Sequence, residues 1–566
     1  MKSKRVSCLL GIFVSTCILY SVLLIPAPAP PVPPAGIMEP FVWNMDEYWS
    51  SLETEFKAAK SLDDSSLSSR IVKGFTELDS LLVRLHTDKF PPDSPLFASI
   101  ESGFFTLGVL LSAKPYRLGD YIELYSAIRK LIKSQSIHWD MNSNAARDCI
   151  YRILYGGRTA IEEVIMQSAR EDLPQIVLET DEPSITPSAN ILGVDIHSGD
   201  ILVSRGGAPT SALIARGNDY PGNFSHAALT YVDENTGEIS IIESLIEKGV
   251  VITAVEDYLK DTKLRMMILR VRSDLPKMQA DPMLAHKAAA YVLKRVNTEH
   301  IIYDFAMDGQ DDSKFFCSEV VLEAYRHFDI ELWAALSNIS RAGVRSWLSV
   351  FGVENFTTQE PSDLEYDPKL CVVAEWRDYE TLFKDRLDNA VVDVMLEGAD
   401  MGDRINYDFY LLPLARIVKV YSSILNQFDG VGQIPEGMNA TAALRNKRFS
   451  KKHQGIKEKL LILTHRFKQD NAYSPPYWEI VKLARQASLT TKSLSYQHNL
   501  LSEHFVISIQ SNEIQSRLQV GGGQCSGINA ALPVPFKQRA YLLSCYVVNL
   551  QRHVARDWHT VSDCRC

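Results

Sequence analysis

Hydrophobic residues recur at helical spacing through the first third of the chain. Between residues 38 and 180 they fall three or four positions apart, as in Ile71, Phe75, Leu78 and Leu82. This spacing places them on one face of a helix, whereas a half-buried strand would show strict alternation. We therefore expect residues 38–180 to form a mostly helical domain.

The pattern changes after residues 179–188, which carry acids and two prolines and are typical of a linker. Short β-prone runs then follow one another between turn signals. Two helices are expected after the strands, over residues 283–296 and 317–328. We therefore predict an α+β domain over residues 188–350, with an antiparallel sheet and packed helices. The expected strands are residues 201–204, 227–232, 239–243, 250–254 and 264–271.

Helical spacing returns towards the C-terminus, and we expect residues 360–566 to form a mostly helical domain with a cysteine-containing tail. Two apolar stripes predict amphipathic helices in this region. The helical flanks on either side of the central domain could cover it, build a substrate cleft or bind a partner, and the sequence leaves these roles open. One stripe consists of Leu414, Ile417, Val418, Tyr421 and Leu425, and the other of Ile456, Leu460, Leu463 and Phe467.

Residues 1–37 have the pattern of a membrane anchor followed by a proline-rich stem. Three basic residues precede an uncharged run of 20 residues from Val6 to Ile25, which is long enough to cross a bilayer as a helix. The run exceeds the apolar stretch of most signal peptides, and the nearest A-x-A site is followed by Pro30. We therefore favour an uncleaved anchor over a cleaved signal peptide, which would give a secreted protein. The basic end then stays cytoplasmic, so the body lies on the extracytoplasmic side of the cytoplasmic membrane.

Composition excludes several classes of partner. The chain is 46% hydrophobic and 23% charged, as is usual for a soluble globular protein. Its net charge of −10 and the lack of a sustained basic stripe argue against nucleic acid as a partner. No C-x-x-C or H-E-x-x-H motif is present, so we expect no metal and no cofactor. Four cysteines could form one or two disulfides in an oxidising compartment, and they are Cys525, Cys545, Cys564 and Cys566.

Cys317 is the strongest candidate for a nucleophile, because it opens the helix expected over residues 317–328. A helix N-terminus favours the thiolate form of a cysteine. His226 begins an expected strand and can take the thiol proton as general base. A third group should hold the imidazole in one tautomer. Glu243 is our candidate because it ends the neighbouring expected strand, with Ser244 or Glu247 as alternatives.

A wider set of motifs surrounds these residues and resembles a known family. The segments Gly199-Asp200-Ile201-Leu202, Ser225-His226-Ala227, Ile242-Glu243-Ser244, Tyr303-Asp304-Phe305 and Phe316-Cys317-Ser318-Glu319 are similar to those of the YiiX/YaeF-like permuted papain-like amidases. These are circularly permuted NlpC-type cysteine hydrolases, in which the His strand precedes the Cys helix. The resemblance covers roughly residues 190–345.

By this resemblance, the fold should be a permuted papain-like sheet with packed helices. Cys317 should act as nucleophile, His226 as base and Glu243 as the acid that orients it, with the backbone N–H of Cys317 among the oxyanion donors. Tyr303 either lines the pocket or packs in the core. The loop at residues 206–222 departs from a compact family core. With Arg205 and Arg216 it either caps the cleft and contacts an acidic substrate or is simply solvated.

Three functional hypotheses follow from these observations. The first is a membrane-anchored, extracytoplasmic cysteine hydrolase that cleaves an amide bond in cell-wall peptide through an acyl-enzyme. The second uses the same residues as a lipid acyl hydrolase or acyltransferase. The third, from a different class, is a non-catalytic envelope binding or scaffold protein.

Overall fold

The computed structural model describes residues 2–28, 31–32, 39–43, 46–168, 175–179, 182–333, 335–426, 428 and 430–490. These residues belong to one compact unit. The four tail cysteines lie outside the described residues, as do most of the proline-rich stem and the end of the expected C-terminal domain.

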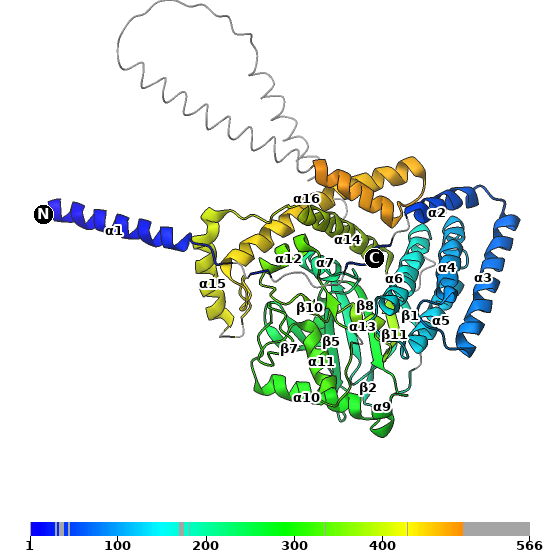
Figure 1. Cartoon of the computed structure of the whole chain (residues 1–566). Coiled ribbons are helices and arrows are strands. Elements are labelled where there is room, and N and C mark those ends of the chain that lie inside the picture. The colour runs from blue at the N-terminus through cyan, green and yellow to red at the C-terminus, as the bar shows by residue number, and fades with distance from the viewer. Residues whose placement is uncertain are drawn as a thin grey trace, which may run out of the picture. The chain divides into compact units, whose positions relative to one another are not determined.

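The helical pattern of the N-terminal third corresponds to a bundle of helices, seen at one side of the sheet in Figure 1. Each of three helices begins at a polar side chain that accepts a backbone N–H, for example Asp63 from Ser66 and Ser143 from Ala146. Their apolar stripes meet in one core. The helices are α2 (Asp46–Ala59), α3 (Asp64–Thr87), α4 (Pro95–Ala113), α5 (Leu118–Ser136) and α6 (Asn144–Gln167).

The central region forms a seven-stranded antiparallel sheet in the order β1-β11-β8-β4-β5-β6-β7. The five strands expected from the sequence are all present, within two residues of the expected bounds at each end. They are β4 (Ile201–Gly206), β5 (His226–Val232), β6 (Ile239–Leu245), β7 (Gly249–Ala254) and β8 (Lys263–Val271).

Two further strands extend this sheet from regions that we expected to be helical. β1 (Ile176–Leu178) comes from the end of the N-terminal region, and β11 (Leu370–Trp376) comes from the C-terminal one. β11 pairs with β8 through six residue pairs. The sheet therefore does not end with the expected domain boundary at residue 350.

Side chains alternate between two cores on the faces of the sheet. Ile201 and Val203 pack against helices α10 (Leu284–Thr298) and α11 (Cys317–Arg326). Leu202 between them packs on the other face with the hairpin of β2 (Ser188–Ile191) and β3 (Val194–His197). Because successive residues of a strand point to opposite faces, both faces are covered. The two helices match those expected from the sequence, and the fold is α+β.

A network of buried ion pairs joins the bundle to the sheet. Arg129 on α5 and Arg158 on α6 both contact Glu375 on β11, and Arg377 contacts the same carboxylate at 2.8 Å. Each of these side chains is almost fully buried. The three guanidinium groups hold the pKa of Glu375 well below its usual range, although burial alone would raise it. The helical flank is thus joined to the sheet by buried charges within one compact unit.

The C-terminal helices pack in two groups. α14 (Tyr379–Asp400), α16 (Ala440–Asn471) and the helical residues 477–490 share a core with α7 (Pro209–Arg216) and α12 (Ala342–Ser349). α15 (Leu412–Asn426) lies at the opposite side of the sheet from the bundle (Figure 1). Shorter elements are α8 (Val255–Lys260), α9 (Pro276–Ala280), α13 (Asp363–Tyr366), the 3-10 turn η2 (Phe409–Leu411), β9 (Ser337–Asn338) and β10 (Thr357–Thr358).

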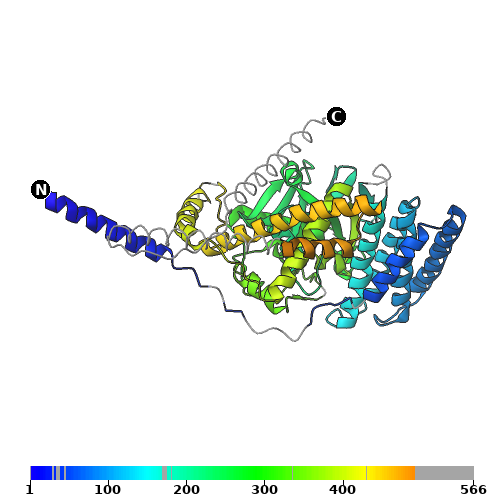
Figure 2. The same cartoon turned by 90° about the horizontal axis from the view of Figure 1, so that it is seen from above.

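Two helices are relevant to whether the chain contains a membrane-spanning segment. Within the described residues, α4 is long and apolar enough to cross a membrane, and 56% of its apolar window is buried in the bundle. This burial is typical of a core helix. The N-terminal helix α1 (Lys2–Leu23) includes the shorter apolar stretch Phe13–Leu23, whose side chains are mostly exposed. Its end lies beside α15 in both Figure 1 and Figure 2.

Candidate active site

Cys317 is the first residue of α11, as the sequence predicts. Phe316 before it is extended, and its backbone N–H donates to the Glu319 carboxyl at 2.8 Å. This contact satisfies a donor that the helix itself leaves free. The cysteine is 5% exposed, and its sulfur lies 3.8 Å from the carbonyl oxygen of Ser225. The thiol is thus held against the start of β5.

His226 and Glu243 meet across neighbouring strands. His226 opens β5, and the register pairs Ala228 of β5 with Glu243 of β6, so both side chains lie at the same end of the sheet. The Nε2 atom of His226 is 2.8 Å from Oε2 of Glu243. The other carboxylate oxygen accepts a hydrogen bond from the Thr253 hydroxyl at 2.7 Å. With Nε2 engaged by Glu243, the remaining ring nitrogen of His226 is the one available to the Cys317 thiol.

The two alternatives to Glu243 have other positions. The Ser244 hydroxyl donates to the carbonyl oxygen of Phe315 at 2.6 Å and thereby fixes the segment before Cys317. Glu247 is exposed. Of the three side chains considered from the sequence, Glu243 is therefore the one that contacts the imidazole.

The electrostatics of the three residues favour a thiolate–imidazolium pair. Burial alone would raise the pKa of the Cys317 thiol, but the hydrogen bond and charge of His226 outweigh burial and lower it. Burial alone would lower the pKa of His226, but its contacts with Cys317 and Glu243 raise that pKa to about 9. The pKa of Glu243 is lowered despite burial, because His226 stabilises its charged form. Relative to the isolated groups, both directions stabilise a protonated imidazole and a charged sulfur.

Two further groups interact electrostatically with Cys317, and they are Tyr303 and Glu360, an acid that the sequence did not reveal. Burial raises the pKa of Tyr303 well above its usual value, and Cys317 and Glu360 raise it further. Burial likewise raises the pKa of Glu360, with Asp363 and Cys317 adding to the effect. The charged form of this buried carboxyl is thus disfavoured, partly through its electrostatic interaction with Cys317. No motif marks it, because it precedes the late strand β11 and lies outside the expected domain boundary.

The loop at residues 206–222 neither presents arginines to the site nor stays solvated. It contains α7, and both Arg205 and Arg216 are buried. Arg205 pairs with Asp385 at 3.3 Å, and Arg216 pairs with Asp393 at 2.8 Å, both on α14. The alternative that these arginines contact an acidic substrate is therefore wrong. Both positive charges are neutralised by carboxylates within the fold.

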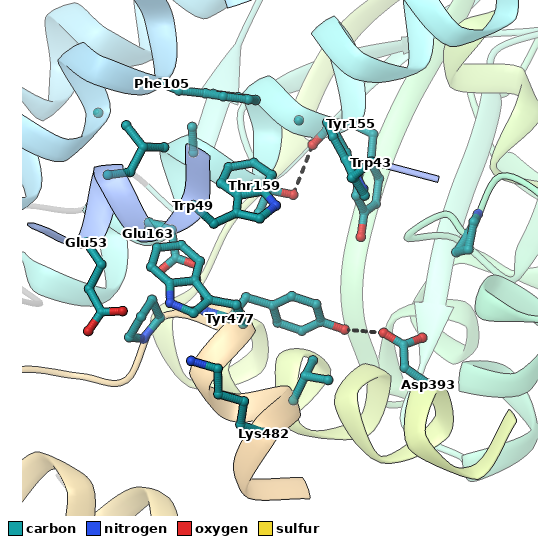
Figure 3. A pocket seen from close by; sticks show the side chains of 18 of the residues that line it. Trp43, Trp49, Glu53, Phe105, Tyr155, Thr159, Glu163, Asp393, Tyr477 and Lys482 are labelled. Atoms are coloured by element: carbon teal, nitrogen blue, oxygen red, sulfur yellow. Dashed lines mark hydrogen bonds between the residues drawn. The ribbon is translucent and has the colours of Figure 1, made fainter. Parts of the chain in front are cut away.

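A cavity of about 800 Å³ lies apart from the cysteine, between the bundle and the helical residues 477–490. Figure 3 shows its aromatic walls, which include Trp43, Trp49, Phe105 and Tyr477. Its acid Asp393 accepts a hydrogen bond from Tyr477 and pairs with an arginine. None of Cys317, His226 and Glu243 lines this cavity. Within the described residues, no group of His, Cys, Asp and Glu is arranged to hold a metal ion.

A family model for permuted papain-like amidase enzymes of the YaeF/YiiX, C92 family matches residues 195–374. Comparisons with curated proteins and with solved structures gave no match. The family match confirms the resemblance drawn from the sequence and extends it through most of β11. It includes the strands that carry His226 and Glu243 and the helix that carries Cys317. The central part of this chain is therefore a permuted papain-like cysteine amidase domain of the YaeF/YiiX type.

Proposed function

We propose that Cys317, His226 and Glu243 form the catalytic triad of a membrane-anchored thiol amidase. The observation that supports this most directly is their convergence. The 2.8 Å contact between His226 and Glu243 occurs beside a buried thiol at a helix N-terminus. Nucleophile, base and orienting acid in hydrogen-bond sequence are the arrangement that nucleophilic catalysis requires.

The proposed reaction has two halves. The Cys317 thiolate attacks the amide carbonyl carbon, and backbone N–H groups at the start of α11 stabilise the resulting oxyanion. The His226 imidazolium then donates its proton to the leaving nitrogen, the C–N bond breaks, and a thioester forms on Cys317. In the second half, neutral His226 takes a proton from water, the hydroxide adds to the thioester, and the acid is released. The thiolate and imidazolium are thereby restored.

We place the enzyme at the extracytoplasmic face of a membrane, anchored by the uncharged run from Val6 to Ile25. The basic residues before this run and the positive-inside rule support that orientation. Cell-wall peptide is the substrate that we propose first, because it offers amide bonds in that location. The proposal for the bond type rests on the amidase family, and the proposal for the substrate rests on the anchor.

A lipid amide or acyl ester is a second candidate substrate. It is favoured by a specific observation, since the loop before α16 packs on the ring of Phe305 and the backbone oxygen of Tyr303, in the segment that is hydrogen-bonded to Phe315 just before Cys317. That loop follows α15, whose outer face is apolar. An apolar surface close to the nucleophile suits a substrate that remains partly in a bilayer.

The triad is tested by the alkylation rate of Cys317 against pH, resolved by peptide mass spectrometry on the full chain in detergent. We expect an inflection below the ordinary cysteine value of about 8.5 and a shift to higher pH in His226→Ala. Cys149 and Cys371 serve as internal controls, because burial raises their pKa to about 12. A Cys317 thiol that is unreactive and indifferent to His226 in the folded chain would overturn the triad and favour the scaffold hypothesis.

The substrate is tested separately with Cys317→Ala as the inactive control. Release of new amino groups from wall peptide by the wild type alone supports the first substrate. Release of fatty acid from detergent-dispersed lipid amides or esters, with wall peptide left intact, would replace it with the second.

A further inference from the structure

The amphipathic helix α15 has its apolar stripe turned outward. Leu414, Ile417, Val420, Tyr421 and Ile424 are all exposed, with Ile417 at 62%. These positions are three or four residues apart and so form one continuous stripe along the helix. The buried residues of the helix are instead Leu412, Pro413, Ala415 and Ser422. Leu412 and Ala415 pack on the start of α16. A surface helix normally has the reverse arrangement, with its apolar stripe against the core.

The stripe is extended at both ends and carries no free cation among the described residues. The 3-10 turn before α15 exposes Phe409 and Tyr410, and Phe428 is exposed after it. Lys419 points inward and donates to the carbonyl oxygen of Pro435 at 2.6 Å. Arg416 donates to backbone carbonyls of the segment after α1 and at its end. The outward face of this region is therefore an apolar and aromatic surface.

The contact between α15 and the N-terminal segment fixes where this surface lies. Arg416 binds the carbonyl oxygens of Val22 and Ile25, and Tyr20 donates to the carbonyl oxygen of Tyr410 at 3.4 Å. Ile25 is the last residue of the uncharged run. If that run crosses a bilayer, its end lies at the bilayer surface, and α15 is held at the same level (Figure 2).

We propose that the outward stripe of α15, with Phe409, Tyr410 and Phe428, is a bilayer-contact surface that lies in the lipid interface beside the anchor. This inference rests on the proposed anchoring by α1 and adds a second contact to it. An interfacial helix buries its apolar face about 5–10 Å into the boundary between headgroups and acyl chains. Tyrosine side chains are enriched at that depth because one end is apolar and the other is wet. A protein partner is a less fitting occupant, because the surface is continuous with the membrane run itself.

The surface also places the active site relative to the lipid. The loop from α15 to α16 brings Gly437 so close to the ring of Phe305 that an added Cβ would lie 2.6 Å from it. Phe305 packs edge-on against Tyr303 with ring centroids 5.0 Å apart. The residues on either side of Tyr303 form backbone hydrogen bonds with Phe315, two residues before Cys317. A short chain of packed residues therefore links the bilayer surface to the nucleophile. This placement of the active site near the bilayer surface favours substrates that lie within reach of the membrane interface.

The test uses the full chain in nanodiscs, with one fluorescent amino acid introduced in place of a single isoleucine. Ile417 reports on the α15 stripe and Ile18, 60% exposed, reports on α1. Ile462 on α16 is the matched control, because it is an isoleucine at 63% exposure. It lies about 33 Å from Ala440, the first residue of α16, at 1.5 Å per residue. Each labelled chain must retain the alkylation rate of Cys317, which shows that it is folded. The measured quantity is the loss of fluorescence when acyl-brominated lipids replace ordinary lipids.

We expect the probes at Ile417 and Ile18 to lose fluorescence and the probe at Ile462 to keep it. Loss at Ile18 alone would refute the bilayer-contact surface while leaving the anchor in place. Loss at Ile417 alone would support the surface and refute the anchor. Loss at neither position would overturn both, and equal loss at Ile417 and Ile462 would show only non-specific adsorption, against the surface. Quenching at Ile417 by a second labelled chain, without quenching by lipid, would identify another copy as the occupant instead.

Discussion

Replacing Glu243 by glutamine should narrow the pH range in which the thiolate–imidazolium pair exists. The substitution keeps both contacts, because the amide oxygen can accept from His226 and the amide nitrogen can donate to Thr253. It removes only the charge. The pKa of His226 is raised from 6.5 to about 9, and a difference of this size corresponds to roughly 3 kcal/mol. That stabilisation is shared between Glu243 and the Cys317 thiolate.

If Glu243 supplies about half of the roughly 3 kcal/mol that stabilises the His226 imidazolium, the pKa of His226 should fall by about one unit in Glu243→Gln. One pKa unit corresponds to about 1.4 kcal/mol. Deprotonation of the imidazolium would then begin at lower pH, and the thiol pKa of Cys317 would rise because its cationic partner is less stable. In pH-resolved alkylation, the Cys317 inflection should move upward, and turnover near neutral pH should fall about tenfold, the factor that corresponds to about 1.4 kcal/mol. The matched control is Glu247→Gln, which removes the same charge from an exposed site nearby. An unchanged inflection and turnover in Glu243→Gln would refute the role given to this carboxylate.

Substitutions at three further positions, with their controls, test the packing and charge pairing that support the fold and the site. Glu375→Gln leaves the surrounding arginines with one buried positive charge unmatched, so we expect a loss of about 3–5 kcal/mol of stability, measured as a lower Tm. Because the folded pKa of Glu375 is depressed, its contribution is present above the unfolded value of about 4.3 and is lost as pH falls through the folded pKa. The Tm difference should therefore shrink in acid, and a difference that grew in acid would contradict this reasoning. Burial raises the pKa of Glu319 to about 9, so Glu319→Gln should match the wild type at pH 7, whereas Glu319→Ala should lose about 1 kcal/mol with its N-terminal helix contact. A lower Tm for the glutamine variant would show that the carboxyl is charged. Gly437→Ala should displace Phe305 and lower kcat, while Gly455→Ala, which meets nothing within 4 Å, should not, and equal activity of the two variants would refute a link between that loop and the nucleophile.

Local patterns in the sequence were enough to locate most elements and all three proposed catalytic residues. The five expected strands and the helix that begins at Cys317 are present because each depends on nearby residues, through alternation, turns and a helix start. His226 and Glu243 could be proposed together because adjacent strands in a hairpin pair by a local register. Glu360 could not be found in this way, since its burial and its electrostatic interaction with Cys317 depend on packing between segments that lie far apart in the chain.

The sequence by itself determined periodicity, and periodicity specifies which side chains share a face but not what that face meets. It predicted α15 as an amphipathic helix, yet only the tertiary structure showed its stripe facing outward at the end of the membrane run. The same limit applies to Arg205 and Arg216, whose charges are neutralised by acids on α14, and to β1 and β11, which join the sheet from both flanks. In each case the partner lies about 100 residues away or more. Contacts of that range depend on how the whole chain packs, because burial and charge pairing are decided by neighbours in space rather than in sequence.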